Sequence, residues 1–188
     1  MSFKRETVLH EAMLAFWKNG YETTSVVDLT AAMGISAPSL YAAFGDKKSL
    51  FLEVVALYAG SDEDRVRAIA EAESARAAAS AMLMACATLY TGEATPPGCL
   101  LASSTASGSD AHADTRAAVT GIRAQGRQAL RRRIEEDVEA GMLPADTDAT
   151  ALSDLVFAVA QGMSTLARDG ASRVELEGIA RRAMVAWS

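Results

Sequence analysis

The stretch that decides the fold of this chain is residues 23–58, TTSVVDLTAAMGISAPSLYAAFGDKKSLFLEVVALY. Ser25 is followed three residues later by Asp28, a spacing that favours a capping box at the start of a helix. Gly34 then supplies a turn, and Ser36 is placed to cap a second short helix. Two short helices joined by a glycine turn are the layout of a helix-turn-helix, whose second helix enters the major groove of DNA.

The second short helix has an outward side made mostly of small residues. Small side chains let the backbone approach DNA closely, and alanine methyl groups can contact thymine methyl groups. Ser39 can bond a base or a phosphate, while Tyr41 and Lys47 are placed to bind phosphates. Thr24 and Ser25 can offer hydroxyls and free N–H groups to a phosphate. The residues that we expect to contact DNA are Thr24, Ser25, Ala37, Pro38, Ser39, Tyr41, Ala42 and Lys47.

A helix from about Lys4 to Asn19 is expected before this stretch, because its apolar residues fall on one stripe and Gly20 can end it. Periodicity alone leaves a second interpretation open. The same residues could form a three-helix packing unit in which Tyr41 is a surface aromatic and Lys47 is solvated.

The composition favours an all-helical chain. Half of the 188 residues are hydrophobic, only 6% are aromatic, and prolines number four. Strands would require β-branched and aromatic runs that the sequence lacks. This length allows one domain, or a small domain followed by a larger one.

The net charge of −6 does not by itself indicate a nucleic-acid binder. Residues 1–60 carry five basic residues against six acidic ones, so cations must be placed on one face to attract DNA. No apolar stretch is long enough to span a membrane, and the first residues do not form a signal segment. Cys86 and Cys99 form neither a disulfide framework nor a metal spacing. We therefore expect a cytoplasmic protein with no metal and no cofactor, and a redox role for either cysteine stays open.

Residues 16–50 resemble the tetracycline-repressor (TetR) family of bacterial regulators in order and spacing. The matching residues are Phe16, Gly20-Tyr21, Thr24-Ser25-Val26, Leu29, Gly34-Ile35-Ser36, Ser39-Leu40-Tyr41, Phe44 and Asp46-Lys47-Lys48-Ser49-Leu50. The resemblance implies a homodimer that reads a palindromic double-stranded DNA operator. It also implies a C-terminal helical domain in which a small-molecule effector binds and releases DNA. Ala42 and Ala43 stand where the family often has larger polar or aromatic groups, and Val27 where a polar residue is frequent.

We expect a helix-turn-helix domain over residues 1–47 and a helical ligand-binding and dimerisation domain over residues 48–188, with about nine helices in all. Helices are predicted for about 46–58, 62–91, 113–141, 149–168 and 173–187. Residues 98–102 resemble the opening of a short buried helix that borders the ligand cavity in the family, and residues 103–109 are expected to form a loop or a helix end. Arg131 with Glu135 and Arg132 with Glu136 have the spacing of exposed ion pairs, and His112 is expected at the surface.

Two sets of residues in the second domain are candidates for function. The residues predicted to line a ligand pocket are Met82, Cys86, Leu89, Tyr90, Cys99, Leu100, Phe157 and Gln161. For any single one of them, ordinary core packing is the favoured alternative. The last two helices have broad apolar stripes, typical of a four-helix interface between two subunits. The predicted interface residues are Leu152, Leu155, Val156, Val159, Met163, Ile179, Met184 and Trp187.

Together these features predict a ligand-responsive DNA-binding transcriptional regulator, a repressor that a small molecule releases from its operator. The alternative from another class is a small helical ligand-binding protein without DNA function. Enzymatic activity is not expected, because the chain has no phosphate loop, no HExxH motif and no nucleophile elbow.

Overall fold

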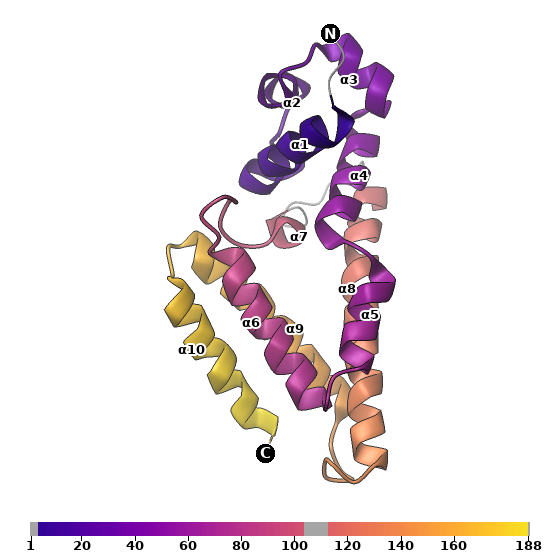
Figure 1. Cartoon of the computed structure of the whole chain (residues 1–188), viewed down its shortest axis with the longest axis vertical. Coiled ribbons are helices and arrows are strands. Elements are labelled where there is room, and N and C mark those ends of the chain that lie inside the picture. The colour runs from indigo at the N-terminus through magenta and orange to yellow at the C-terminus, as the bar shows by residue number, and fades with distance from the viewer. Residues whose placement is uncertain (1–3, 104–112, 188) are drawn as a thin grey trace. The chain divides into compact units, whose positions relative to one another are not determined.

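A computed structural model describes residues 4–103 and 113–187, and every regular element within them is helical. The helices, shown in Figure 1, are α1 (Arg5–Asn19), α2 (Val26–Met33), α3 (Ala37–Phe44), α4 (Lys47–Ala59), α5 (Asp62–Ala70), α6 (Ala75–Tyr90), α7 (Leu100–Ser103), α8 (Ala113–Glu139), α9 (Ala149–Arg168), α10 (Arg173–Ala183) and a 3₁₀ helix, η2 (Met184–Trp187). The all-helical prediction is confirmed.

The chain divides into two compact units. Unit 1 is Met1–Gly60 with Cys99–Gly121, and unit 2 is Ser61–Gly98 with Ile122–Ser188. This division by packing differs from the predicted boundary after Lys47, because α4 buries Phe51, Val54 and Val55 within unit 1. The functional boundary at residues 47 and 48 stays a prediction.

The core of unit 1 is built around aromatic rings. The Phe16 ring lies edge-on to Phe51 with centroids 5.2 Å apart, and Tyr21 lies 4.6 Å from the same Phe51 ring. Trp17 and Tyr58 form a second edge-on pair at 4.9 Å. Such pairs add stability beyond the area that they bury, so α1 and α4 provide a firm support for the two short helices between them.

Small residues form much of the core of unit 2. On α6 the buried positions include Ala79, Leu83 and Ala87, and on the neighbouring helices they include Met163 and Leu176. Alanine allows close approach between helices, which is why α6, α9 and α10 lie side by side in Figure 1.

The predicted continuous helix over residues 62–91 is wrong, since α5 ends at Ala70 and α6 begins at Ala75. Ser74 caps the N-terminus of α6, because its hydroxyl oxygen accepts a hydrogen bond from the Ala77 N–H at 3.1 Å. The Ala75 N–H donates to the buried carboxylate of Asp137 on α8 at 2.7 Å. The break therefore depends on a residue more than 60 positions away in the sequence, and no glycine or proline marks it.

Arg133 completes this connection between α8 and the start of α6. It forms an ion pair with Asp137 and donates to the carbonyl oxygens of Ala72 at 3.2 Å and Glu73 at 3.3 Å. The two charged side chains keep only 13% and 2% of their surface exposed. The sequence indicated an exposed charged stretch here, so this buried pair was missed.

The remaining helices follow the predictions closely. The predicted helix 149–168 is α9, and α8 ends two residues before the predicted limit at Gly141. The last predicted helix is α10 followed by η2, and the short helix expected near residue 100 is α7. Predictions for residues 104–109 and for His112 lie outside the described residues.

Of the two predicted exposed ion pairs, one is present. Arg131 pairs with Glu135 at 3.2 Å, whereas Glu136 lies 3.9 Å from Arg133 rather than pairing with Arg132 as predicted. Within the described ranges, no single helix is long and apolar enough to cross a membrane. The bent pair α2 and α3 meets the length and composition test only when its two parts are joined.

Candidate nucleic-acid interface

The α2 and α3 helices meet at an angle of 92°, within the 90–120° typical of helix-turn-helix motifs. Gly34 makes the turn with φ of +64°, a left-handed conformation that glycine adopts without strain. Leu29 on α2 and Leu40 on α3 are fully buried on the inner sides of the two helices. The opposite side of α3 is thereby turned to solvent.

The outward side of α3 is small, apolar and accessible. Pro38, Tyr41 and Ala42 are exposed, Tyr41 to 48%, while Ala37 and Ser39 are half-buried. The hydroxyl groups of Ser36 and Ser39 lie 2.9 Å apart, and the Ser36 oxygen also accepts the Ser39 N–H at 3.3 Å. These bonds cap α3 at Ser36, as predicted, and hold its first turn in place.

Thr24 does not fit the expectation that its hydroxyl binds a phosphate. Its side chain is fully buried, and Oγ1 donates to the carbonyl oxygen of Gly20 at 2.6 Å. Thr24 therefore ties the end of α1 to the entry of α2. In this structure the Thr24 hydroxyl is therefore not accessible to a phosphate.

Ser25 and Asp28 form the predicted capping box. The Asp28 N–H donates to Oγ of Ser25 at 3.1 Å, and the Ser25 N–H donates to Oδ2 of Asp28 at 2.8 Å. The Ser25 hydroxyl also donates to Oδ2, and these bonds lower the pKa of the Asp28 carboxyl. The Ser25 side chain is exposed, but its hydroxyl proton already has this partner.

Lys47 lies at the start of α4, where Asp46 caps the helix through the Ser49 N–H at 2.6 Å. Its Nζ is 4.6 Å from the centroid of the Tyr21 ring and donates to the carbonyl oxygen of Glu22 at 3.4 Å. Burial lowers the pKa of the Lys47 ammonium. A cation held against an aromatic ring is fixed in position, which suits a phosphate contact.

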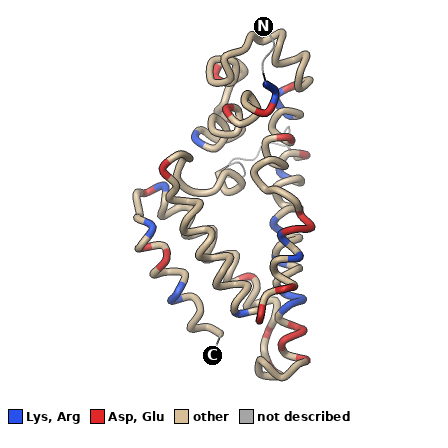
Figure 2. The backbone as a smooth tube through the Cα atoms, viewed as in Figure 1, with Lys and Arg blue, Asp and Glu red and all other residues tan. Residues whose placement is uncertain are grey.

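Two other cations of unit 1 are engaged in ion pairs. Nη2 of Arg5 lies 2.6 Å from Oε2 of Glu53, and Cζ of Arg5 lies 4.6 Å from the centroid of the Phe44 ring. Arg5 therefore packs on the last residue of α3. Lys48 pairs with Asp114, which raises the pKa of the lysine and lowers that of the aspartate. Neither α2 nor α3 contains a lysine or arginine, and Figure 2 accordingly shows no blue on these two helices. Electrostatic attraction for DNA must therefore come from few residues.

The predicted pocket residues are divided between the two units. Cys99 and Leu100 belong to unit 1, where Leu100 is fully buried and the Tyr58 hydroxyl donates to Sγ of Cys99 at 3.4 Å. Leu100 therefore has no surface for a ligand, because it is packed in the core. The other six predicted residues belong to unit 2.

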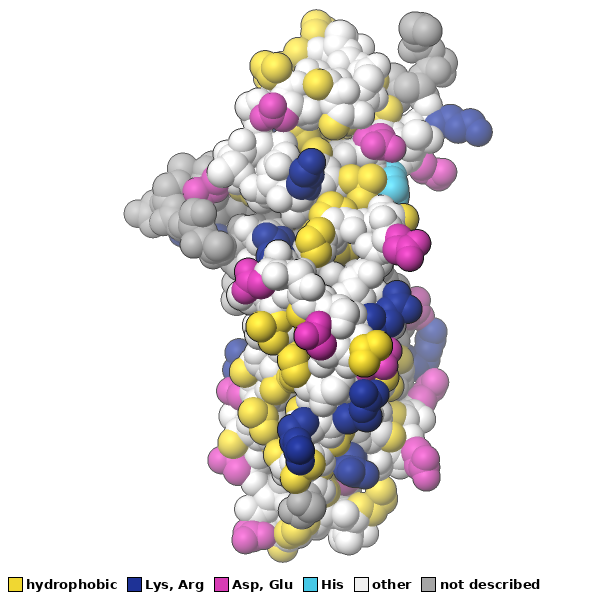
Figure 3. Space-filling model, turned by 90° about the vertical axis from the view of Figure 1, so that its left-hand side faces the viewer, with side chains coloured by type: hydrophobic (Ala, Val, Ile, Leu, Met, Phe, Trp, Pro, Cys, Tyr) yellow, Lys and Arg dark blue, Asp and Glu magenta, His cyan; other side chains and the backbone are white. Residues whose placement is uncertain are grey.

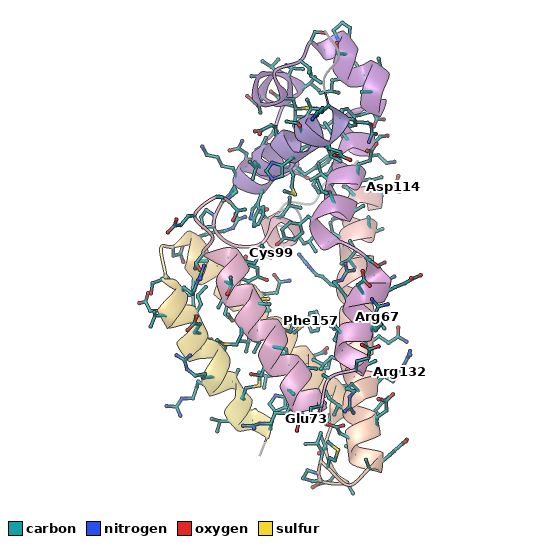
Figure 4. The ribbon with its side chains drawn as sticks, in the orientation of Figure 1. Arg67, Glu73, Cys99, Asp114, Arg132 and Phe157 are labelled. Atoms are coloured by element: carbon teal, nitrogen blue, oxygen red, sulfur yellow. The ribbon has the colours of Figure 1, made fainter. Side chains whose placement is uncertain are left out.

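Among those six, the degree of exposure varies. Met82, Cys86, Phe157 and Gln161 are half-buried, whereas Leu89 is exposed and Tyr90 is buried. Figure 4 shows Phe157 on α9, and its ring packs directly on α8. A β-carbon at Gly126 would lie only 3.0 Å from Cζ of Phe157. Glycine at position 126 makes room for this ring.

A separate pocket of about 510 Å³ lies in unit 2 where the end of α6 meets the start of α10. Of the eight predicted residues it includes Tyr90 alone. Its polar lining includes Thr91, Glu93, Ser172 and Arg173, and Arg173 donates to Oγ1 of Thr91 at 3.5 Å. The pocket prediction as a whole stays untested.

The predicted dimer residues fall into two groups. Val156, Met163, Met184 and Trp187 are buried in the chain's own core, so they do not offer a surface to a second subunit. The other four, Leu152, Leu155, Val159 and Ile179, are exposed or half-buried.

Three further accessible residues belong to the same predicted stripes but are not among the predicted interface residues. Leu166 on α9 and Val174 on α10 are exposed, and Gly162 is exposed between the leucines. Figure 3 shows apolar and basic side chains mixed over the face of unit 2 where α10 lies. The sequence identified the apolar stripes of these two helices but could not separate inner from outer residues on a broad stripe, and the dimer interface itself stays a prediction.

Unit 1 has a further accessible residue that the prediction left out. Val27 on α2 is 75% exposed, more than any other large apolar side chain of the described residues. Its place two residues before the buried Leu29 was the signal, since residues two apart point to opposite sides of a helix.

Two family models match the chain. The one described as "Bacterial regulatory proteins, tetR family" matches residues 8–54, and "Tetracyclin repressor-like, C-terminal domain" matches residues 63–183. The first match covers most of α1, all of α2 and α3, and α4 as far as residue 54. The second covers most of unit 2.

Individual proteins are similar as well. The HTH-type transcriptional repressor ComR of Escherichia coli (strain K12) is 32% identical over 187 residues, which are 98% of this chain and 89% of ComR. The HTH-type transcriptional repressor BdcR of the same organism is 40% identical over 60 residues, 32% of this chain and 30% of BdcR. Among solved structures, a cysteine mutant of the TetR family transcriptional regulator CifR, complexed with 26-bp double-strand operator DNA, has a TM-score of 0.91 and 35% identity. That similarity covers 100% of this chain and 99% of CifR.

Proposed function

The chain belongs to the tetR family of bacterial regulatory proteins, and on that premise we propose that it is a transcriptional repressor released from operator DNA by a small molecule. The proposal assigns it no enzymatic activity and places it in the bacterial cytoplasm, where chromosomal DNA is found. It acts as a homodimer on a palindromic operator, and each protomer presents one α3 helix to the major groove.

The observation that carries this proposal is the accessible side of α3. Pro38, Tyr41 and Ala42 are exposed on a helix whose other side is locked into the core by Leu40 and Phe44. Tyr41 can donate its hydroxyl to a phosphate, and Lys47 can approach another from the start of α4. CifR, the relative with a TM-score of 0.91, is complexed with operator DNA in its structure, which supports the same role here.

Release by a ligand requires two dimer states that differ in the spacing of the α3 helices. One state matches the roughly 34–36 Å between successive major grooves, and the other does not. A ligand bound in unit 2 can lower DNA affinity by no more than the ratio of its own affinities for the two dimer states. We propose that the half-buried residues Met82, Cys86, Phe157 and Gln161 contribute to its binding site, since flexible methionines adapt to apolar ligands.

The dimer surface in this proposal is the outer side of α9 with part of α10. The exposed or half-buried apolar positions on α9 recur every three or four residues, as on helices that pair side by side: Leu152, Leu155, Val159, Gly162 and Leu166. Burying this row against the same row of a second copy removes apolar surface from water, which favours association.

The direct test is fluorescence anisotropy with duplexes from the DNA flanking the chain's own coding region, with random-sequence duplex as competitor. We expect specific binding that Tyr41→Phe weakens about tenfold, because a hydrogen bond to a charged phosphate is lost. Lys47→Met should weaken binding and reduce the slope of log affinity against log salt by about one.

Lys18→Met is the matched control, since Lys18 is exposed at the far end of α1 and is not assigned to the interface. It should leave the salt slope unchanged. If no duplex competes specifically, while small molecules raise the melting temperature of the protein, the chain is a ligand-binding protein without DNA function.

A further inference from the structure

The DNA-facing surface of α3 lacks the side chains that read purines. Arginine or lysine binds guanine, and asparagine or glutamine binds adenine, through paired hydrogen bonds in the major groove. The residues on the outer side of α3 include none of these four types: Ala37, Pro38, Ser39, Tyr41 and Ala42. The hydroxyl of Ser39 is already bonded to that of Ser36 at 2.9 Å. Sequence recognition on this helix must therefore use mainly apolar contacts.

The first helix of the helix-turn-helix carries a large apolar side chain that is open to solvent. Val27 in the first turn of α2 is 75% exposed, and its backbone is held on both sides. The Ser25–Asp28 capping box fixes the turn in which Val27 lies, and the Thr30 hydroxyl donates to the Val27 carbonyl oxygen at 3.0 Å. A β-branched side chain has few rotamers, so its methyl groups are presented at a fixed place.

The four bases present only one methyl group in the major groove. Thymine carries a methyl group at C5, while guanine, cytosine and adenine present hydrogen-bond donors and acceptors there. Covering a donor or acceptor with a methyl group leaves it unbonded, which costs free energy, whereas covering the thymine methyl removes apolar surface from water. An apolar reading surface therefore discriminates in favour of thymine.

We propose that Val27 on α2, together with Ala42 on α3, recognises thymine methyl groups, so that thymine occupies the contacted positions of each half-site. This inference rests on the proposed function and names the chemistry by which operator DNA is selected. Val27 acts as a specificity-determining residue through its methyl groups, and the phosphate contacts of Tyr41 and Lys47 supply sequence-independent affinity.

The first measurement finds the preferred duplex by selection from a randomised pool with the full-length protein. Each thymine of the selected half-site is then replaced by deoxyuridine, which removes only the C5 methyl group. We expect a loss of about fourfold in affinity at each contacted thymine, the equivalent of one buried methyl group. At the same positions, 5-methylcytosine paired with guanine should bind better than cytosine paired with guanine.

The variant Val27→Ala identifies the contact by a double-mutant cycle. At the thymine that Val27 covers, deoxyuridine should cost the variant nothing further, whereas the other thymines keep their full effect. Leu57→Ala is the control, because Leu57 is an equally apolar side chain of unit 1 that is 47% exposed on α4. It should retain every deoxyuridine effect of the wild-type chain.

Two results would overturn the inference while leaving the proposed function intact. One is a selected duplex whose affinity does not change with deoxyuridine at any position. The other is a deoxyuridine effect that Val27→Ala leaves unaltered at every thymine. Failure of the selection to enrich any sequence would defeat the proposed function itself, and this inference with it.

Discussion

The hydroxyl of Thr24 shows what separates a contact residue from a positioning residue. Thr24 and Ser25 are adjacent, and both suit the N-terminus of a helix, so the sequence predicted the same role for both. Their exposure differs because the packing of α1 against α2 covers Thr24 and leaves Ser25 at the surface. The identities of the small residues on α3 were predictable, but burial of one hydroxyl depends on helix packing.

Thr24→Val should therefore affect stability and not DNA binding. The change keeps the shape of the side chain but leaves the Gly20 carbonyl oxygen without its buried partner. We expect the free energy of unfolding in urea to fall by about 1–3 kcal/mol. Affinity for the selected duplex, measured by anisotropy well below the melting temperature, should stay within twofold of the wild type. A large loss of DNA affinity without a loss of stability would instead indicate that the Thr24 hydroxyl contacts DNA.

For the helices, local sequence signals predicted most of the helix ends. The break between α5 and α6 was not predicted, and residues of the distant helix α8 contact it. Serine caps and glycine turns marked the ends of α2 and α3, and both were found where predicted. Glu71, Ala72 and Glu73 are all compatible with a continuing helix, so the local signal at the break between α5 and α6 is the cap residue Ser74 alone. Asp137 and Arg133 of α8 also hold the break, and that pairing could not be predicted from residues 62–91.

Asp137→Asn tests this interpretation of the break. Asparagine keeps the size of the side chain but removes the buried charged partner of Arg133, which then retains only the exposed Glu136 at 3.9 Å. Removing one member of a buried ion pair costs about 3–5 kcal/mol, and we expect a loss of that order in urea unfolding.

Glu135→Gln is the matched control. It removes an ion pair from the same helix, with Arg131, but both side chains are about half exposed. The expected loss is below about 1 kcal/mol. Equal effects of the two substitutions would show that the Asp137–Arg133 pair does not stabilise the break.

The capping box of α2 should make stability depend on pH in one direction. Hydrogen bonds from Ser25 lower the pKa of Asp28 below its ordinary value of 3.8. The ionised carboxyl therefore stabilises the folded state fully above pH 3.8, and this contribution is lost as the pH falls through the lower folded pKa.

The difference in unfolding free energy between the wild type and Asp28→Asn measures this effect. It should be constant at neutral pH and shrink only in acid, below pH 3.8. The same carboxyl titrated by NMR should show a midpoint below that value. A difference that shrinks already near neutral pH would mean that another group is responsible.

For the whole molecule, the sequence predicted that α9 carries an apolar surface, but it did not predict which residues of α9 are accessible. The stripe on α9 was recognised as apolar, but a stripe that is wide enough to pack on both sides does not reveal which side faces inward. Val156 and Met163 face the core of unit 2, and Leu155 and Leu166 face solvent. The ligand pocket was harder still, because it depends on how helices distant in sequence are arranged.

Operator binding as proposed requires a dimer. With a net charge of −6 and few free cations near α3, one protomer has little electrostatic attraction for DNA. A dimer binds one duplex more tightly than a single protomer does, because the second α3 helix binds intramolecularly once the first is bound. This gain in affinity needs no further type of contact. Leu155→Glu should prevent this by placing a charge on the exposed row of α9, while the chain itself stays folded.

Hydroxyl-radical footprinting of the selected duplex, combined with sedimentation of the complex, shows whether two protomers bind one operator through their α3 helices. We expect two protected half-sites whose centres lie about one helical turn of DNA, or a multiple of it, apart, with two protomers bound per duplex. Leu155→Glu should abolish both half-sites together. A single protected site occupied by one protomer, or paired protection that persists in a monomeric Leu155→Glu variant, would contradict it.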